Sequence, residues 1–240
     1  MNMNIKRVEH KYFIPKMLVE EIKYSLSKIM LEDKNNSGVS GYKITSIYYD
    51  TPFDDDLNQK LDGIIYREKY RLRVYDHSAK FGKFEIKRKL NYSIEKLSLE
   101  LNEKEIRRLI SSDFNPLCKH NEFEYAAHRM KYKHYTPKSI VEYDRFAFYL
   151  PVNNIRVTID SNLSNYGFKS DFDNIQDQIP NRVQKRGYEI LEVKYDGFIP
   201  KSILSILSSY PIRQSAISKY ALSRIDNNTE SQGDNLVIPF

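Results

Sequence analysis

Cationic and apolar side chains alternate along two neighbouring segments of this sequence. Residues 66–76 are YREKYRLRVYD, in which Arg71 and Arg73 alternate with Leu and Val, and after a short loop residues 83–90 are KFEIKRKL, in which Lys87 follows Ile. Because successive side chains of a β-strand point to opposite faces, each segment is predicted to be a strand with one apolar and one charged face. Such a pair needs a second layer over its apolar face and an anion near its charged face.

The rest of the chain supplies more strands of this kind, together with helices. Residues 7–14, RVEHKYFI, and 189–196, EILEVKYD, alternate similarly, and apolar residues in 16–30 recur at the spacing of a helix. A strand-rich order with inserted helices predicts an α+β fold with a largely antiparallel sheet. The predicted strands are residues 7–14, 45–50, 66–76, 83–90, 139–150, 154–163 and 189–196, and the predicted helices are 16–30, 102–110, 121–132, 200–210 and 215–225.

The chain shows no internal repeat or long linker that would divide it. Residues 1–225 are therefore predicted to form a single domain, and residues 226–240, DNNTESQGDNLVIPF, a polar C-terminal tail. No apolar run is long enough for a membrane segment, and the start, MNMNIKRVEHKYFI, lacks the apolar core of a signal peptide, so a cytoplasmic location is expected. The single Cys118 excludes an internal disulfide and a cysteine-built zinc site.

The charged strand faces can be accommodated in two ways. An open sheet with its polar face in water is the usual arrangement of antiparallel strands. However, like charges directly opposite each other destabilise a sheet, and Lys and Arg dominate the central strands here. The apolar faces are also numerous, and helices are available to cover them. We therefore predict a closed antiparallel β-barrel, a tunnel with polar side chains inside and helices packed outside.

A cationic tunnel needs an anionic guest, and the net charge of +6 agrees with one. A linear polyphosphate suits such a tunnel, because Arg and Lys side chains bind phosphate oxygens strongly. The chain contains neither GxxxxGK[ST] nor GxGxxG, so side chains rather than a glycine-rich loop would hold the phosphates.

Carboxylates lie among these cations. Glu9, Glu85 and Glu192 share the charged faces of their strands. Each could hold Mg²⁺ or Mn²⁺ through oxygen ligands, or could pair with a neighbouring Arg or Lys and reduce the repulsion. The pattern leaves both roles open for Glu192 and favours ion pairing for Glu85 and Glu9. For the consecutive residues Asp54–Asp56, a loop or a helix start is favoured over a metal cluster.

Ordered motifs run along almost the whole chain: VEHKYFIP, SIYYDTPFDDDL, YRLRVYD, FEIKRK, SIEKLSL, VEYDRFAF, NIRVTID, EILEVKYDGFIP and QSAISKYALSRI. From about Arg7 to about Ile225 the chain resembles the polyphosphate polymerase (vacuolar transporter chaperone, VTC) domain family, part of the CYTH-like superfamily of triphosphate tunnel metalloenzymes. Together with the charged strand faces, the resemblance implies catalytic Arg71, Arg73, Lys87, Arg145 and Arg156, substrate-binding Lys11, Lys69, Lys96, Lys194, Ser218 and Lys219, and Mn²⁺ or Mg²⁺ on Glu192, with Glu85 and Glu9 as further candidate ligands.

The resemblance implies a metal-dependent phosphotransferase that moves the γ-phosphate of ATP onto a growing polyphosphate chain, with no specific nucleic-acid partner. The absence of any Ser-His-Asp or Cys-His pattern agrees with a reaction that needs no side-chain nucleophile. Two alternatives stay open: a triphosphatase that uses the same tunnel with water as acceptor, and a non-catalytic module that binds polyphosphate or another polyanion. The chain departs from the family at Ala216, where the polymerase has a lysine two residues before the position of Ser218.

Overall fold

An eleven-stranded antiparallel sheet is the centre of the structure, a computed structural model that describes residues 7–75, 79–90, 93–167, 172, 178–183 and 186–224. Its main path runs β11-β1-β10-β8-β7-β3-β4-β5-β6, and β2 and β9 pair with β7 and β8. The predicted tail, residues 226–240, lies outside the described residues. The strands are β1 (Arg7–Pro15), β2 (Leu31–Glu32), β3 (Tyr42–Asp50), β4 (Tyr66–Tyr75), β5 (Phe81–Leu90), β6 (Ser93–Asn102), β7 (Thr136–Leu150), β8 (Ile155–Gly167), β9 (Asn181–Arg182), β10 (Tyr188–Asp196) and β11 (Arg213–Gln214).

The helices confirm the predicted positions, with one addition. The Asn102 side chain accepts the backbone N–H of Glu105 at 3.1 Å, and the Glu105 carboxylate accepts that of Asn102, so α3 begins with a complete capping box. No helix in the described residues is long and apolar enough to cross a membrane, and the cytoplasmic location stays a prediction. The helices are α1 (Val19–Ser27), α2 (Asp55–Leu61), α3 (Glu103–Ile110), α4 (Asn121–Tyr132), α5 (Lys201–Ser208) and α6 (Lys219–Arg224), with 3-10 turns at Lys16–Leu18, Asn115–Lys119 and Val152–Asn154.

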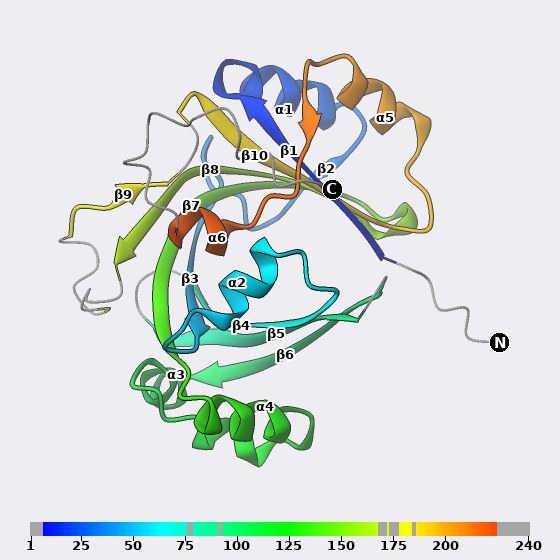
Figure 1. The fold of residues 1–240 in the computed structure, drawn as a ribbon. Helices are drawn as coiled ribbons and strands as arrows, with labels where there is room; N and C mark the ends of the chain where they lie inside the picture. The colour runs from blue at the N-terminus through cyan, green and yellow to red at the C-terminus, as the bar shows by residue number, and fades with distance from the viewer. Residues whose placement is uncertain are drawn as a thin grey trace.

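The apolar strand faces pack against helices in two separate cores. On β4 and β5, Leu72 and Phe84 are fully buried in a cluster that includes Ile106 of α3 and Met130 of α4. On the other half of the sheet, strand residues such as Val193 pack with side chains of α1 and α5. Figure 1 shows α1 and α5 above the upper strands and α3 and α4 below the lower ones. Both charged faces therefore turn toward each other on the inner face, the side of the curled sheet away from these four helices.

The sheet curls but does not close, so the prediction of a closed barrel is not confirmed. Within the described residues, the edge strands β6 and β11 form no ladder with each other. The free edge of β1 pairs instead with β11, where Tyr12 and Phe13 lie opposite Gln214 and Arg213. Side chains nevertheless span the inner face: the Lys87 Nζ of β5 lies 3.0 Å from a carboxylate oxygen of Glu9 on β1. The inner face therefore has two walls, one containing β4 and β5 and the other containing β1 and β10. These walls are joined by ion pairs rather than by backbone hydrogen bonds.

One part of the inner face is apolar and is covered by α2 and α6. Tyr48 of β3 and Ile190 of β10 pack there with Leu57 of α2 and Tyr220 of α6. The buried Asp50 fixes both helices: its carboxylate accepts the backbone N–H groups of residues 51, 56 and 57 at 2.8, 2.9 and 3.0 Å and the Tyr220 hydroxyl at 2.7 Å. Asp54–Asp56 form the start of α2, as the favoured alternative predicted.

A buried acid in α2 makes the stability of this region depend on pH. The Tyr135 hydroxyl donates to Asp56 Oδ1 at 2.9 Å, whereas Oδ2 is buried and has no hydrogen-bond partner in the described part of the chain. Burial and the nearby Asp50 raise the pKa of Asp56 from 3.8 to about 7. Because this pKa is raised in the folded state, the stabilisation is complete below about pH 4 and is lost as the pH rises through 7.

The Asp56→Asn variant should therefore lose this pH dependence. The difference in the free energy of unfolding between Asp56→Asn and wild type is expected to shift in favour of the variant by roughly 1–3 kcal/mol between pH 5 and pH 8, because only wild type loses this stabilisation. Urea titrations at both pH values measure it. The exposed Asp62→Asn at the end of the same helix is the control and should show no such difference. Equal pH profiles for wild type and Asp56→Asn would contradict the assignment.

Candidate functional site

The pairing register brings opposite charges together along the inner face. Lys11 lies opposite Glu192 on the β1–β10 ladder, and Arg71 lies opposite Glu85 on the β4–β5 ladder. These positions alternate with the residues of the outer cores, so the predicted division of each strand into a charged and an apolar face is confirmed. The charged side chains of the inner face form three groups, each built on one or two carboxylates.

The first group is built on Glu85, which is only 3% exposed. Arg71 donates to its Oε2 through Nε and Nη2 at 2.9 and 2.6 Å, and the Arg73 Nε lies 3.5 Å from the same oxygen. The Lys96 ammonium contacts the other oxygen. Burial alone would raise the pKa of Glu85, but Arg71, Arg73 and Lys96 hold it well below its ordinary value. Three cations share the two oxygens of Glu85, which favours a counter-charge over a metal ligand.

The second group joins the two walls through Glu9 and Glu192. Lys11 and Lys87 each lie 3.0 Å from one oxygen of Glu9, and Lys194 lies 2.8 Å from Glu192 Oε1. Burial would lower the pKa of Lys11, but Glu192 and Glu9 raise it above its ordinary value. Burial likewise opposes ionisation of Glu192, yet Lys11 and Lys194 hold its pKa well below the ordinary value. The Glu192 charge in turn works against the ionisation of Glu9, so the two carboxylates are close neighbours.

The third group is built on Asp160, which is fully buried. Arg145 donates to its two oxygens at 2.6 and 2.7 Å, and the Lys219 Nζ lies 2.6 Å from Oδ2. Burial would raise the pKa of Asp160, but Arg145 and Lys219 lower it to about 2. Arg145 Nη2 also lies 3.6 Å from Glu192 and so links this group to the second.

The backbone beside Arg145 is closely packed. At Gly41, just before β3, a Cβ would lie 2.0 Å from the Arg145 carbonyl oxygen, so the residue must be glycine.

Asp160 was not among the predicted site residues. Its position on the same strand face as Arg156 was visible in the sequence, but its two partners come from a neighbouring strand and from α6. Only the register of β7 against β8, which places Arg145 directly opposite Asp160, identifies it as the anchor of this group.

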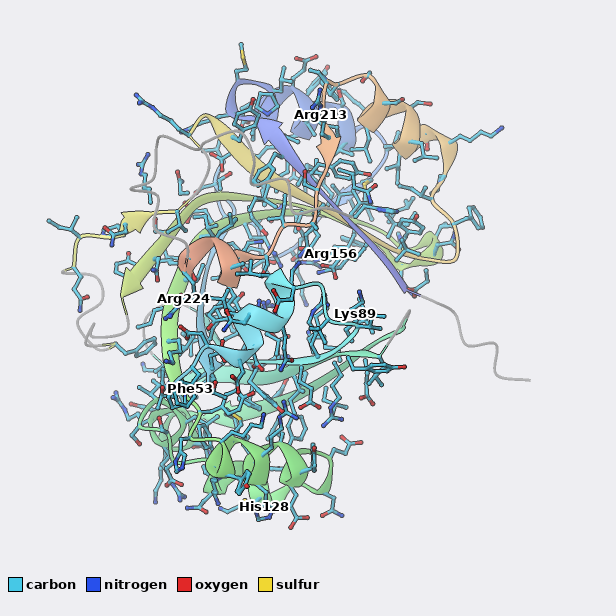
Figure 2. All side chains as sticks on the ribbon, in the orientation of Figure 1. Phe53, Lys89, His128, Arg156, Arg213 and Arg224 are labelled. Carbon is cyan, nitrogen blue, oxygen red and sulfur yellow. The ribbon has the colours of Figure 1, made fainter. Side chains whose placement is uncertain are left out.

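Arg156 pairs with a carboxylate outside the three groups. Its Nη2 contacts an Asp33 oxygen at 2.6 Å and the Tyr42 hydroxyl at 3.1 Å, and its side chain is 34% exposed. Figure 2 shows Arg156 between the upper and lower halves of the sheet, whereas Arg213 lies at the top of the view. Arg156 lies opposite Lys194 on the β8–β10 ladder, so it borders the second group.

The segment before α6 crosses the inner face and brings backbone and hydroxyl groups to it. Lys11 donates to the Ile217 carbonyl oxygen at 3.1 Å, and Lys69 donates to Ser218 Oγ at 3.3 Å. Ala216 is exposed. The predicted Lys69, Ser218 and Lys11 are thus brought together, and all eleven predicted cations and hydroxyls lie on the charged strand faces or at the start of α6.

The residues present fit a divalent cation only if a substrate helps to hold it. The described part of the chain has no group of three or more His, Cys, Asp or Glu side chains that could bind a metal alone. Glu9 and Glu192, however, place two neighbouring carboxylates on the inner face. Mg²⁺ is commonly bound by one or two carboxylates, waters and substrate phosphates, and this pair suits such a role.

Solved structures share this architecture. A candidate adenylate cyclase from Bacillus halodurans superposes with a TM-score of 0.53 at 13% identity, over 89% of this chain and 94% of that one. The Hippeastrum protein HpAC1, a candidate adenylyl cyclase with a dominant triphosphatase activity, superposes with a TM-score of 0.55 at 13% identity, over 91% and 95% of the two chains. At this level of identity the likeness shows a shared fold.

A protein-family model identifies the family of this chain. The model of the VTC domain matches residues 6–224, and the chain belongs to this family. No curated protein sequence matches the chain. The match confirms the family that the ordered motifs indicated and covers the described strands and helices from β1 to α6.

The Glu85 group yields a test of how the inner face is stabilised. Glu85→Gln leaves Arg71, Arg73 and Lys96 without their shared counter-charge, and the free energy of unfolding should fall by about 3 kcal/mol. Added tripolyphosphate should restore part of the loss, because its oxygens can replace the missing charge. Urea unfolding with and without tripolyphosphate measures both effects.

The matched control is Glu100→Gln, since Glu100 pairs with Lys83 at 2.9 Å on the next strand but is 66% exposed. It should cost less than about 1 kcal/mol, with no recovery by tripolyphosphate. Equal losses in the two variants would show that Glu85 does not hold the cations of the inner face.

Proposed function

We propose that this protein is a polyphosphate polymerase that transfers the γ-phosphate of ATP to a growing polyphosphate chain along the inner face. The observation that carries the proposal is the surplus of cations over carboxylates there: Glu9, Glu85, Asp160 and Glu192 each contact at least two Lys or Arg side chains. The surplus positive charge needs a polyanion. Membership of the VTC family and the triphosphatase activity of a protein with the same fold support phosphate chemistry.

In this proposal the two walls divide the work. Arg71, Arg73 and Lys87 on one wall and Arg145 and Arg156 on the other bind the oxygens of the transferred phosphoryl group and its neighbours. Since phosphoryl transfer requires mainly positioning and charge stabilisation, fixed cations can supply most of the catalysis. The remaining cations and Ser218 would hold the rest of the chain, and the bound chain, rather than backbone pairing, would complete the tunnel between the walls. The substrate-binding residues are Lys11, Lys69, Lys96, Lys194, Ser218 and Lys219.

Glu192, with Glu9 beside it, would hold Mn²⁺ or Mg²⁺ together with phosphate oxygens. When bound, the ion would neutralise part of the phosphate charge. Lys194 and Arg145 keep Glu192 ionised and oriented, so that its carboxylate is ready as a ligand when ATP arrives. Glu85 is engaged by three cations on the facing wall and is proposed to act as a counter-charge.

The attacking group would be the terminal phosphate of the growing chain. A triphosphatase is the second candidate, because HpAC1 shares the fold and has that activity. In that case water would attack the γ-phosphate in the same site. A non-catalytic polyanion-binding module would use the same cations without turnover.

Incubation of the purified protein with ATP and Mn²⁺ distinguishes these functions. Long-chain polyphosphate together with ADP is the result expected of a polymerase, and gel staining and phosphate assays measure both products. Release of free phosphate without long chains would identify a triphosphatase instead. Binding of tripolyphosphate with neither product would leave only the binding module.

Variants of the two walls test the assigned roles. Glu192→Gln should lower metal-dependent turnover by a factor on the order of 10²–10³, while Arg71→Ala and Lys87→Ala should weaken triphosphate binding as well as turnover. Lys23→Ala is the control, because Lys23 lies on α1, outside the inner face, and pairs with Glu20. Full metal-dependent turnover in Glu192→Gln would remove that residue from the metal site. Unchanged triphosphate affinity in both cation variants would overturn the inner-face site itself.

A further inference from the structure

Lys69 differs from every other cation predicted for the site in what it contacts. Within the described residues its Nζ has no carboxylate partner; it lies 3.3 Å from Ser218 Oγ, 4.4 Å from the Tyr48 ring centroid and 5.1 Å from that of Tyr220. Each of the other predicted cations contacts at least one carboxylate: Lys11, Arg71, Arg73, Lys87, Lys96, Arg145, Arg156, Lys194 and Lys219.

The charged groups that face Lys69 are mostly cations. Arg71 follows it on the same face of β4, Lys87 lies directly opposite it on β5, and Lys11 approaches from β1. Cross-strand neighbours of this kind have Cβ atoms about 5 Å apart, where a like charge is destabilising. Asp56 of α2 favours the charged form of Lys69, but its effect is the smallest among these charged groups. Burial, followed by Arg71, Lys11 and Lys87, lowers the pKa of Lys69 well below its ordinary value.

The remaining contacts of Lys69 are with neutral groups. The Ser218 hydroxyl can donate to a neutral amine or accept from an ammonium, so it suits both forms. The Tyr48 and Tyr220 rings favour the ammonium by about 0.5–2 kcal/mol. Without an anion, this gain opposes the repulsion from three neighbouring cations and the cost of burial. A phosphate oxygen reaching this position would provide the negative charge that the protein itself does not.

We propose that Lys69 is a proton-coupled phosphate ligand: the bound phosphate chain occupies the place that a carboxylate holds beside each of the other predicted cations, and Lys69 takes up one proton from solvent as the chain binds. The inference rests on the proposed function only in that the inner face binds phosphate chains. It adds that the binding of a phosphate chain to the inner face and the protonation of Lys69 are linked. Binding must then weaken as the pH rises, because the proton becomes harder to obtain.

A direct test follows the titration of the lysine side chains by NMR. The probes are the ¹³C-labelled Cε signals of the full-length protein, and Lys69→Arg identifies the Lys69 signal by its disappearance. In the free protein the Lys69 signal should titrate well below the other lysines, and saturating tripolyphosphate, without metal, should move its titration upward. Titration together with the other lysines in the free protein would overturn the proposal. So would a Lys69 titration that tripolyphosphate leaves unmoved.

The affinity for tripolyphosphate gives an independent readout that a purely structural lysine would not change. Calorimetric Kd values between pH 7.5 and pH 9.5 are expected to rise more steeply in wild type than in Lys69→Met, by up to about tenfold per pH unit. The titration of tripolyphosphate itself is common to both proteins and cancels in the comparison. Lys69→Arg, whose side chain stays charged, should also lack the extra slope, and it serves if Lys69→Met does not fold.

The matched control is Lys23→Met, which removes a well-covered lysine from α1 and should keep the wild-type slope. Parallel pH profiles for wild type and both Lys69 variants would overturn proton coupling. Proton-coupled binding without any product from ATP would reject the proposed polymerase while supporting the role of Lys69. Failure of tripolyphosphate to bind at any pH would reject both.

Discussion

Repulsion among the cations of the inner face is the constraint on which the structure depends, and buried carboxylates offset it. Glu85, Asp160 and Glu192 are each at most 5% exposed, and each lies between side chains of opposite charge. A buried ion pair gains little over an apolar pair, but removal of one partner leaves a costly buried charge. The carboxylates therefore permit, rather than drive, the folding of this face. The driving force lies in the outer cores, where the apolar faces of the same strands pack against α1, α3, α4 and α5.

The period-2 alternation predicted the long strands and their faces well, because strand parity is a local property of the sequence. It could not predict how the edges of the sheet end. β11 is only two residues long and shows no alternation, yet it occupies the edge of β1. The helix α2 was seen only as a candidate start at Asp54–Asp56, since its stabilising contacts come from Asp50. Both depend on tertiary contacts that no local pattern records.

The candidate site was predictable to the extent that its residues lie on alternating strands and match ordered motifs. The partners of those residues were not, because they depend on register and curvature. Lys87 meets Glu9 across the inner face, although the two strands are not neighbours in the sheet. From the sequence, both a metal-binding and an ion-pairing role stayed open for Glu192, and ion pairing was favoured for Glu85 and Glu9. In the structure Glu85 has its oxygens engaged by three cations, whereas Glu9 and Glu192 are neighbours that repel each other. A divalent cation would relieve that repulsion, so Glu9 and Glu192 suit a metal better than Glu85 does.

Pairing most of the cations also bears on how a long chain could move through the site. A row of bare cations would bind each phosphate so tightly that a product would not advance, whereas conduction of charged species requires many sites of moderate strength. Cations that already contact a carboxylate are held in place, and thus are preorganised for phosphate, but part of their charge is offset. Among the residues that the structure describes, Lys69 has no such partner, and it contacts Ser218 and two phenol rings. On this view the paired cations guide the chain, and Lys69 distinguishes an occupied from an empty inner face.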